Sequence, residues 1–546
     1  MPRPWPLCPC RVLLVYGVCQ LGVFHCRSKV HSTASPASQA NPIAHVTSVT
    51  MKSTALFTGL LAAVTQVQAA SVIAHFMLIN TMNYTLGDFE DDFRLAKEAH
   101  IDAFALNMGL TDPHTPEALE DAFAAAKTVG FQLFFSFDYN GGYVGGKPWP
   151  KETILAMADE YFKRDEYLKY ADKPVASTFE GTENAEDWIE IKEKTGAFFI
   201  PDWSSISPEE ALGLAGGVAD GLFSWDAWPV GDQDMTSKGD AAYEWALKGK
   251  PYMMPVSPWF YTNLPGYNKN WVWRGDDLWF DRWTQVMEIM PTFVQIISWN
   301  DYGESHYIGP VRSNAMEAFD VGKAPFNYAL DNPHDGWRHT LPFLVDSYKA
   351  AVQPDIRNES LTTWYRSSPA LACKDGGTTA NTAAQSQKVL TAAEVVRDDI
   401  FYSALLTSAA EVTVSVGGRS QKGNWTSVPE GGKGMYHGSA PFLGTGDVVV
   451  SMTKYGVEIA RIEGRRISDE CPGGMTNWNA WVGARDALHV DDPNPATPTQ
   501  TGDGPKSTAS GGGGDDDDDS AASSLSRGGL VYVVASLAGL AVAGVV

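Results

Sequence analysis

The sequence predicts an α/β protein, a (β/α)8 TIM barrel followed by a smaller all-β domain that resembles a sandwich. Between residues 72 and 298, eight short apolar runs alternate with amphipathic stretches. The runs are apolar on both faces, which suits parallel strands covered by helices. After about residue 356, β-branched runs are separated by glycine-rich turns, a pattern typical of antiparallel sheets.

Eight units of this kind in fewer than 300 residues favour a closed barrel over 71–355. The predicted strands span 72–79, 101–108, 131–137, 173–179, 197–201, 219–225, 251–257 and 292–298. The predicted helices span 86–99, 115–130, 151–164, 185–196, 207–217, 239–249, 276–290 and 341–352. The alternative is an open doubly wound sheet, but the glycine-rich phosphate turn common after its first strand does not follow VIAHFMLI.

The β-rich region is predicted to span 356–487. Its strands include EVTVSV, DVVVSMT and VEIARIEG. Carbohydrate binding and structural support are both compatible with this pattern, so its function stays open.

The amino-terminal part has two predicted segments. Residues 51–70 begin with Met-Lys, continue with an apolar run and end in small residues, as secretory signal peptides do. Residues 1–50 have a different composition, so we interpret them as a non-native extension; an unusually long leader is the alternative.

The carboxyl-terminal part is predicted to be a linker and a lipid-attachment signal. Residues 488–520 are rich in Pro, Gly, Thr and Asp and cannot build a core. Residues 521–546 combine small residues, a polar spacer and an apolar tail, which indicates a GPI-attachment propeptide rather than a plain transmembrane tail. We therefore expect a secreted protein held at the cell surface or cell wall, on the outer face of the plasma membrane.

The chain has a formal charge of −24, which becomes −28 without residues 1–50. This charge disfavours a nucleic-acid partner. Only Cys373 and Cys471 remain in the exported part, and we expect them to form one disulfide. Sequons at Asn83, Asn358 and Asn424 fit an exported glycoprotein. We expect a monomer.

Polar and aromatic side chains follow the predicted strands at the carboxyl ends, where a barrel holds its active site. Carboxylates with indoles suit a glycosidase, since indoles stack on sugars and a carboxyl pair flanks the scissile bond. The carboxylates Asp138, Asp301 and Glu304 are the candidate catalytic groups. The candidate substrate-binding residues are Asn80, Asn107, Glu180, Asp202, Trp203, Trp225, Asp226, Trp259, Trp299 and Asn300.

Each piece also has a plainer interpretation. A single Trp is often a core residue, Asp202 and Asp226 could cap helices, and Glu180 could pair with a neighbouring cation. Other chemistries find no support, because HExxH, paired CxxC, GxxxxGK[ST] and GxSxG motifs are absent from the sequence. The sequence therefore disfavours metalloprotease, zinc-module, NTPase and serine-hydrolase functions, and we expect no metal site.

The motifs AHFMLINT, IDAFALNMG, FFSFDYNG and SWNDYGES resemble those of the fungal α-1,3-glucanases, or mutanases, of glycoside hydrolase family 71. The resemblance runs from about Ser71 to Tyr348. It implies a (β/α)8 barrel that hydrolyses α-1,3-glucan with inversion and without a cofactor. It also implies that Asp301, Glu304 and Asp138 are essential.

For the mechanism, we hypothesise that Glu304 is the general acid, with a pKa raised by apolar surroundings and by Asp301. Asp301 would then be the base, although the two roles could be exchanged, and Asp138 would orient water or a hydroxyl, or hold the acid. An inverting pair needs carboxyls roughly 6.5–9.5 Å apart, which residues i and i+3 reach only if their side chains diverge. A non-catalytic wall-binding protein and a glycosidase of another linkage remain the alternatives.

Overall fold

The computed structural model describes residues 70–142, 145–381, 388–491 and 493. The predicted extension, the signal peptide up to residue 69, and the linker and GPI segment from residue 494 onward lie outside these residues. Among the helices of the described ranges, none is long and apolar enough to cross a membrane.

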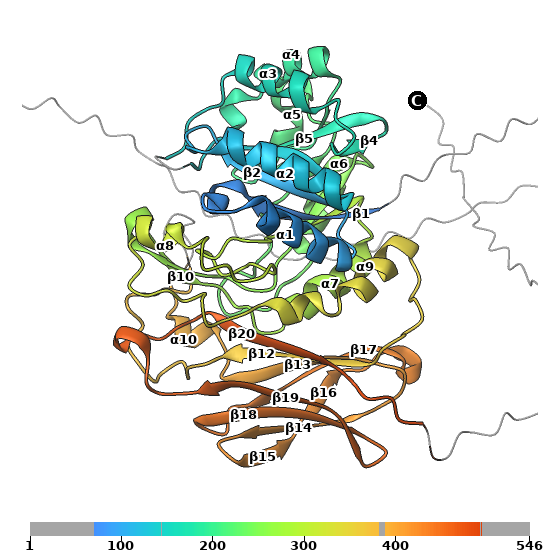
Figure 1. Cartoon of the computed structure of the whole chain (residues 1–546), viewed down its shortest axis with the longest axis vertical. Helices are drawn as coiled ribbons and strands as arrows, with labels where there is room; N and C mark the ends of the chain where they lie inside the picture. The colour runs from blue at the N-terminus through green and yellow to red at the C-terminus, as the bar shows by residue number, and fades with distance from the viewer. Residues whose placement is uncertain (1–69, 143–144, 382–387, 492, 494–546) are drawn as a thin grey trace, which may run out of the picture. The chain divides into compact units, whose positions relative to one another are not determined.

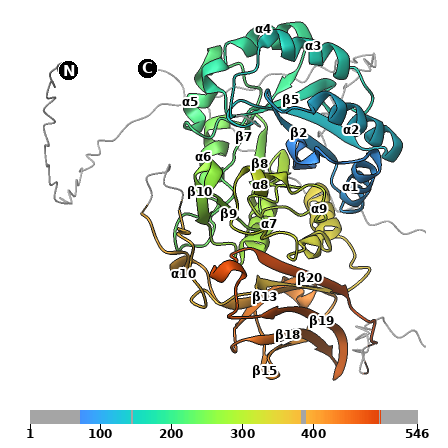
Figure 2. The ribbon, with the colours of Figure 1, turned by 60° about the vertical axis from the view of Figure 1, so that its left-hand side comes forward.

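A curled, mainly parallel sheet forms the first part of the fold (Figures 1 and 2). Each of the eight predicted strands is present: β1 (Ser71–Met77), β2 (Ala103–Gly109), β3 (Gln132–Asp138), β5 (Lys173–Phe179), β6 (Phe198–Phe199), β7 (Leu222–Phe223), β8 (Tyr252–Val256) and β11 (Phe293–Ile296). Hydrogen bonds connect them in the order β5-β3-β2-β1-β11-β8-β7, and β6 pairs with β5. A short strand, β4 (Lys169–Tyr170), pairs antiparallel with β5. Asp202, which follows β6, pairs with Phe179 at the end of β5 and with Phe223 at the end of β7.

Helices follow the strands along the chain, as the apolar periodicity predicts. They are α1 (Leu86–Glu98), α2 (Thr115–Val129), α3 (Lys151–Tyr161), α4 (Asp187–Thr195), α5 (Pro208–Gly213), α6 (Lys238–Leu247), α7 (Leu278–Ile289), α8 (Glu317–Val321) and α9 (Leu341–Ala350). Local signals set their ends: Thr85 and Asp88 form a capping box at the start of α1, and Gly130 ends α2 at a φ of 69°. Their apolar faces pack in one hydrophobic cluster with the strands.

An antiparallel hairpin is inserted between β8 and α7, and the sequence pattern did not predict it. It consists of β9 (Tyr261–Leu264) and β10 (Lys269–Val272). The Tyr261 amide donates a hydrogen bond to the carbonyl of Glu304 at 3.1 Å, so β9 lies against the loop that follows β11.

The β-rich region contains two antiparallel sheets. One has the order β16 (Asn424–Ser427), β17 (Gly434–Pro441), β13 (Asp399–Leu406), β12 (Ser360–Arg366) and β20 (Ala480–Asp486). The other has the order β15 (Arg419–Lys422), β14 (Glu411–Val416), β18 (Gly446–Lys454) and β19 (Val457–Ile467). Residues of both sheets form one buried apolar cluster, so the sheets pack face to face. A short helix, α10 (Ala392–Val395), precedes β13.

The structure confirms the predicted disulfide between Cys373 and Cys471, which joins the segments after β12 and before β20. The sequon residues Asn83, Asn358 and Asn424 are exposed, which is compatible with the predicted glycosylation.

Candidate active site

A cavity of about 840 Å³ opens at the carboxyl ends of the parallel strands. It brings together the three candidate catalytic carboxylates, Asp138 after β3 and Asp301 and Glu304 after β11. Of the predicted substrate-binding residues, Asn80, Asn107 and Trp225 also line it. The expectation that a barrel holds its active site at the carboxyl ends of its strands therefore predicted the position of this cavity and of these acidic groups.

The loop after β11 holds its two carboxylates through a short network of hydrogen bonds. The Ser298 hydroxyl accepts a hydrogen bond from the Asp301 amide at 2.9 Å, and Oδ1 of Asp301 accepts one from the Glu304 amide at 3.0 Å. The Asn300 side chain bonds both backbone groups of Met77, at 2.8 and 3.1 Å. Asn300 therefore fixes this loop to the end of β1, and it does not line the cavity.

Glu304 is held by two cationic or proton-donating groups. Lys269 on β10 forms an ion pair with Oε1, and Nε2 of His306 lies 3.1 Å from Oε2. Burial alone would raise the pKa of Glu304, but Lys269 and His306 outweigh it and hold that pKa well below its ordinary value. This direction is opposite to the raised pKa that the sequence hypothesis gave Glu304, because the sequence did not reveal that the Lys269 ammonium reaches this carboxylate.

Asp301 has the opposite electrostatic character. Burial raises the pKa of Asp301 above its ordinary value, and the negative charge of Glu304 adds to this increase. The two carboxylates therefore differ in proton affinity, and Asp301 binds a proton more tightly than Glu304 does. Pairs of acids whose environments separate their pKa values in this way are suited to acid and base roles.

The two carboxylates lie closer together than the sequence hypothesis required. One oxygen of Asp301, one of Glu304 and a ring nitrogen of His306 lie within 4.8 Å of one another. The side chains do not diverge, because Nε2 of His306 is near both, 3.9 Å from Asp301 and 3.1 Å from Glu304. Such a triad could hold a cation, but the Lys269 ammonium that pairs with Glu304 would repel one.

Asp138 ends β3 and lies against a tight turn. Its Oδ1 accepts hydrogen bonds from the amides of Asn140 at 2.8 Å and Gly141 at 2.5 Å. A side chain at Gly141 would meet Oδ2 of Asp138 at 2.3 Å, so glycine is required for this approach. Burial raises the pKa of Asp138 to about 6, although the two amides favour its charged form.

Three predicted sugar platforms are buried side chains instead. Trp203 packs against Phe199, and Trp299 packs against Phe104. Trp259 donates its indole hydrogen bond to the carbonyl of Trp478 in the β-rich region at 2.9 Å. None of the three lines the cavity, because each indole fills space within the hydrophobic cluster.

Three predicted carboxylates also lie outside the lining of the cavity. Glu180 accepts a hydrogen bond from the Ser205 amide at 3.0 Å. Asp202 is fully buried and accepts one from the Ser204 amide at 3.1 Å, but it does not cap the following helix, because Ser207 caps α5. Asp226 is exposed beside Gly239.

The inserted hairpin supplies site residues that the sequence analysis did not assign. Its two strands and flanking residues contribute Phe260, Leu264, Tyr267, Lys269, Trp271 and Trp273 to the cavity lining. The run of aromatics in WFYTNLPGYNKNWVW was the available signal, but nothing in it showed that Lys269 would meet Glu304.

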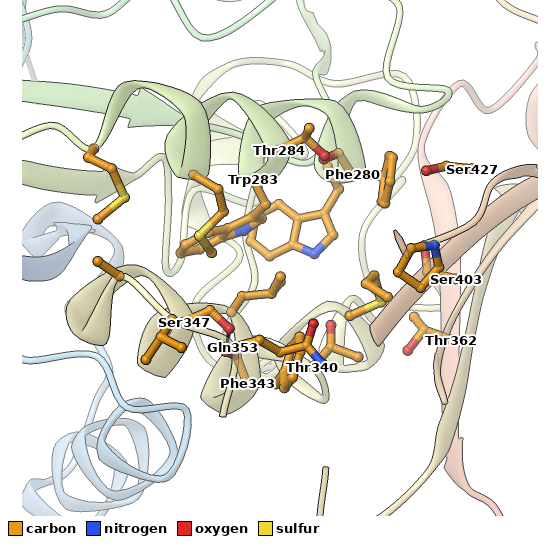
Figure 3. A pocket seen from close by; sticks show the side chains of 18 of the residues that line it. Phe280, Trp283, Thr284, Thr340, Phe343, Ser347, Gln353, Thr362, Ser403 and Ser427 are labelled. Carbon is orange, nitrogen blue, oxygen red and sulfur yellow. Dashed lines mark hydrogen bonds between the residues drawn. The ribbon is translucent and has the colours of Figure 1, made fainter. Parts of the chain in front are cut away.

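A second cavity, of about 500 Å³, lies between α7 and α9 on one side and β12, β13 and β17 on the other (Figure 3). Its wall is mainly aromatic and aliphatic, with Phe280, Trp283 and Phe343 among the labelled side chains. The residues that line it include no carboxylate, so it lacks the groups for acid–base chemistry.

A family model and several relatives match most of the chain. The family model described as glycosyl hydrolase family 71 matches residues 68–494. The chain is 32% identical over 439 residues to the glucan endo-1,3-alpha-glucosidase agn1 of Schizosaccharomyces pombe, covering 76% of this chain and 94% of that protein. It is 34% identical over 355 residues to a mutanase of Penicillium rubens, covering 63% of this chain and 75% of that protein.

Similar solved structures include a GH99 endo-alpha-mannosidase from Bacteroides thetaiotaomicron. The identity is 14%, the match covers 52% of this chain and 99% of that one, and the TM-score is 0.41. Family membership therefore rests on the match to the family model, and the similarity to this solved structure is too low to support it.

Proposed function

The chain belongs to glycosyl hydrolase family 71, and we propose that it hydrolyses the α-1,3-glucosidic bonds of α-1,3-glucan. The names of its relatives, a glucan endo-1,3-alpha-glucosidase and a mutanase, support this substrate. The observation that carries the proposal is the pair of carboxylates with opposed pKa shifts, Glu304 and Asp301, in a cavity lined by indoles.

In the proposed reaction Asp301 is the general acid and Glu304 is the general base. The protonated Asp301 gives its proton to the leaving glucosyl oxygen, and the ionised Glu304 removes a proton from the attacking water. Lys269 keeps Glu304 ionised before the water is activated. Asp138 lies in the same cavity and orients the water or a sugar hydroxyl. These roles exchange those in the sequence hypothesis.

The stereochemical outcome tests this assignment together with the activity. The resemblance implies inversion, for which carboxyl groups are roughly 6.5–9.5 Å apart, whereas one oxygen of Asp301 lies within 4.8 Å of one oxygen of Glu304. We keep inversion as the prediction, to be tested by nuclear magnetic resonance of the first product formed from α-1,3-glucan by the purified protein. A β anomer is expected; an α anomer would indicate a retaining enzyme, and no released sugar would refute the function.

Trp225 is the cavity indole that the sequence identified, and we propose that it forms a sugar platform. It lies half-buried beside His75, with 4.8 Å between the ring centroids. Replacement by Ala is expected to raise KM for α-1,3-gluco-oligosaccharides about tenfold with a smaller change in kcat, because stacking contributes to ground-state binding. Trp225→Phe should recover most of the affinity, and an unchanged KM in Trp225→Ala would remove this residue from the binding site.

For the fold, we infer that the curled sheet is the predicted (β/α)8 barrel and that the two antiparallel sheets form the predicted sandwich. The bridges from Asp202 to Phe179 and Phe223 support closure of the sheet into a barrel.

For the location, we propose action at the cell wall or outside the cell. The disulfide and a 29% identical relative named ascus wall endo-1,3-alpha-glucanase support this proposal. The GPI anchor and the monomeric state stay predictions.

A further inference from the structure

A groove of about 680 Å³ lies on the β-rich region, lined by residues of β19 and β20 and by Leu488 after β20. β20 is the last strand of the five-stranded sheet, and β19 is the last strand of the four-stranded sheet. The two strands lie side by side (Figures 1 and 2). The groove shares no lining residue with the acidic cavity, so the two are separate features.

Trp481 is the aromatic residue of this groove. It lies on β20 opposite Tyr365 of β12, and its indole is partly exposed while Tyr365 is buried. A Cβ at Gly464 would lie 2.7 Å from the indole, and one at Gly483 would lie 2.4 Å from it. Neither glycine has a positive φ. Gly483 therefore leaves space for the Trp481 ring, and Gly464 leaves space for both the Tyr365 hydroxyl, 2.2 Å from its Cβ position, and the Trp481 ring.

The charged groups that line the groove are of both signs, with Arg461 and Arg485 among Glu458, Glu463 and Asp486. Arg461 lies 3.0 Å from Glu463 and 3.7 Å from Glu458. Neighbouring side chains of opposite charge offer many hydrogen-bonding atoms, but their electrostatic fields partly cancel, so they attract an ionic ligand weakly. This combination suits a neutral, hydroxyl-rich ligand better than an ionic one.

A peptide strand added to the open sheet edge is less compatible with the groove. The carbonyl of Ile459 on β19 already accepts a hydrogen bond from the Leu488 amide at 2.7 Å. The chain after β20 therefore uses part of the β19 edge that strand addition would need.

We propose that the Trp481 groove is a second polysaccharide-binding site, which holds a chain of neutral α-1,3-glucan apart from the site of hydrolysis. This inference rests on the proposed function for the identity of the polymer. The exposed part of the indole stacks on a glucose unit, and the charged side chains bond to the hydroxyls of that unit. The groove keeps the enzyme on an insoluble polymer between cleavage events.

Binding by the full-length protein tests the groove directly. In a Glu304→Gln background, which prevents digestion, co-sedimentation with insoluble α-1,3-glucan measures affinity. Trp481→Ala is expected to weaken binding about fivefold. The matched control is Trp245→Ala, which removes an indole that is 77% exposed on α6, and it is expected to leave binding unchanged.

Activity of the otherwise unmodified enzyme separates this inference from the proposed function. Trp481→Ala should slow sugar release from the insoluble polymer and leave kcat/KM for soluble α-1,3-gluco-oligosaccharides within about twofold of wild type, because soluble substrates need no second site. Equal losses on both substrates would indicate a structural role and overturn the proposal. A wild-type enzyme that releases no sugar would refute the proposed function, whatever Trp481→Ala binds.

Arg485→Ala provides a second variant, in case loss of the indole disturbs folding. Arg485 is exposed at the rim of the groove, so its removal leaves the packed cluster intact. It is expected to weaken polymer binding about two- to threefold. If Trp481→Ala and Arg485→Ala both fold and bind the polymer as well as wild type does, the proposal is overturned. Binding of a peptide strand at the edge of the sheet would then be the remaining function for the groove.

Discussion

Glu304→Gln is expected to reduce hydrolysis of α-1,3-glucan by about 10²–10⁴-fold, the usual contribution of a general base. The amide cannot accept a proton from water, and it also loses the ion pair with Lys269. Release of reducing ends from the polymer measures the effect. Asp159→Asn on α3 is the matched control, because Asp159 is an exposed carboxylate paired with Lys163, and we expect it to retain wild-type activity.

Asp301→Asn distinguishes the two roles. Loss of the general acid should reduce cleavage of the polymer by a similar factor but should spare an activated aryl α-glucoside, whose leaving group needs no proton. Glu304→Gln should fail on both substrates, and added azide should restore part of its activity by replacing the activated water. The reverse pattern would return the acid role to Glu304, and near-wild-type rates in either variant would refute the pair.

Much of the fold could be predicted from the sequence because its elements carry strong local signals. β2 and β3 are buried along nearly their whole length, so their sequences are continuous apolar runs. Helices such as α1 carry a capping box and an apolar stripe that are legible without tertiary information. The β9–β10 hairpin was missed because its strands have four residues each and interrupt the regular alternation.

The site was predicted less completely because a position at a strand end does not determine where a side chain points. Asp138, Asp301 and Glu304 face the cavity, whereas Trp299 and Asn300, in the same loop, are buried in packing and in backbone hydrogen bonds. The protonation states of Asp301 and Glu304 could not be predicted from the sequence either. Lys269 is 35 residues from Glu304 in sequence, and only the folded hairpin brings its ammonium to the carboxylate.

Lys269→Met is expected to move the pH profile of kcat/KM toward alkaline pH by about 1–3 units, the usual effect of one adjacent charge on a pKa. In the wild type, Glu304 must be ionised, so activity is lost as the pH falls through its lowered pKa. Without the ammonium, only His306 opposes the effect of burial and the pKa of Glu304 rises, so the acid limb of the profile moves to higher pH. Lys269 also lowers the pKa of Asp301, so the basic limb should move in the same direction.

The direction of the shift separates this electrostatic role from a structural one. A residue that merely supports the β9–β10 hairpin would lower the height of the profile without displacing its limbs. Burial alone would lower the pKa of Lys269, yet its pairing with Glu304 holds that pKa above the ordinary value, so the ammonium persists throughout the working range. Lys269→Arg keeps the charge and should retain the wild-type limbs. An unshifted profile in Lys269→Met would show that another group, with His306 as the nearest candidate, keeps Glu304 ionised.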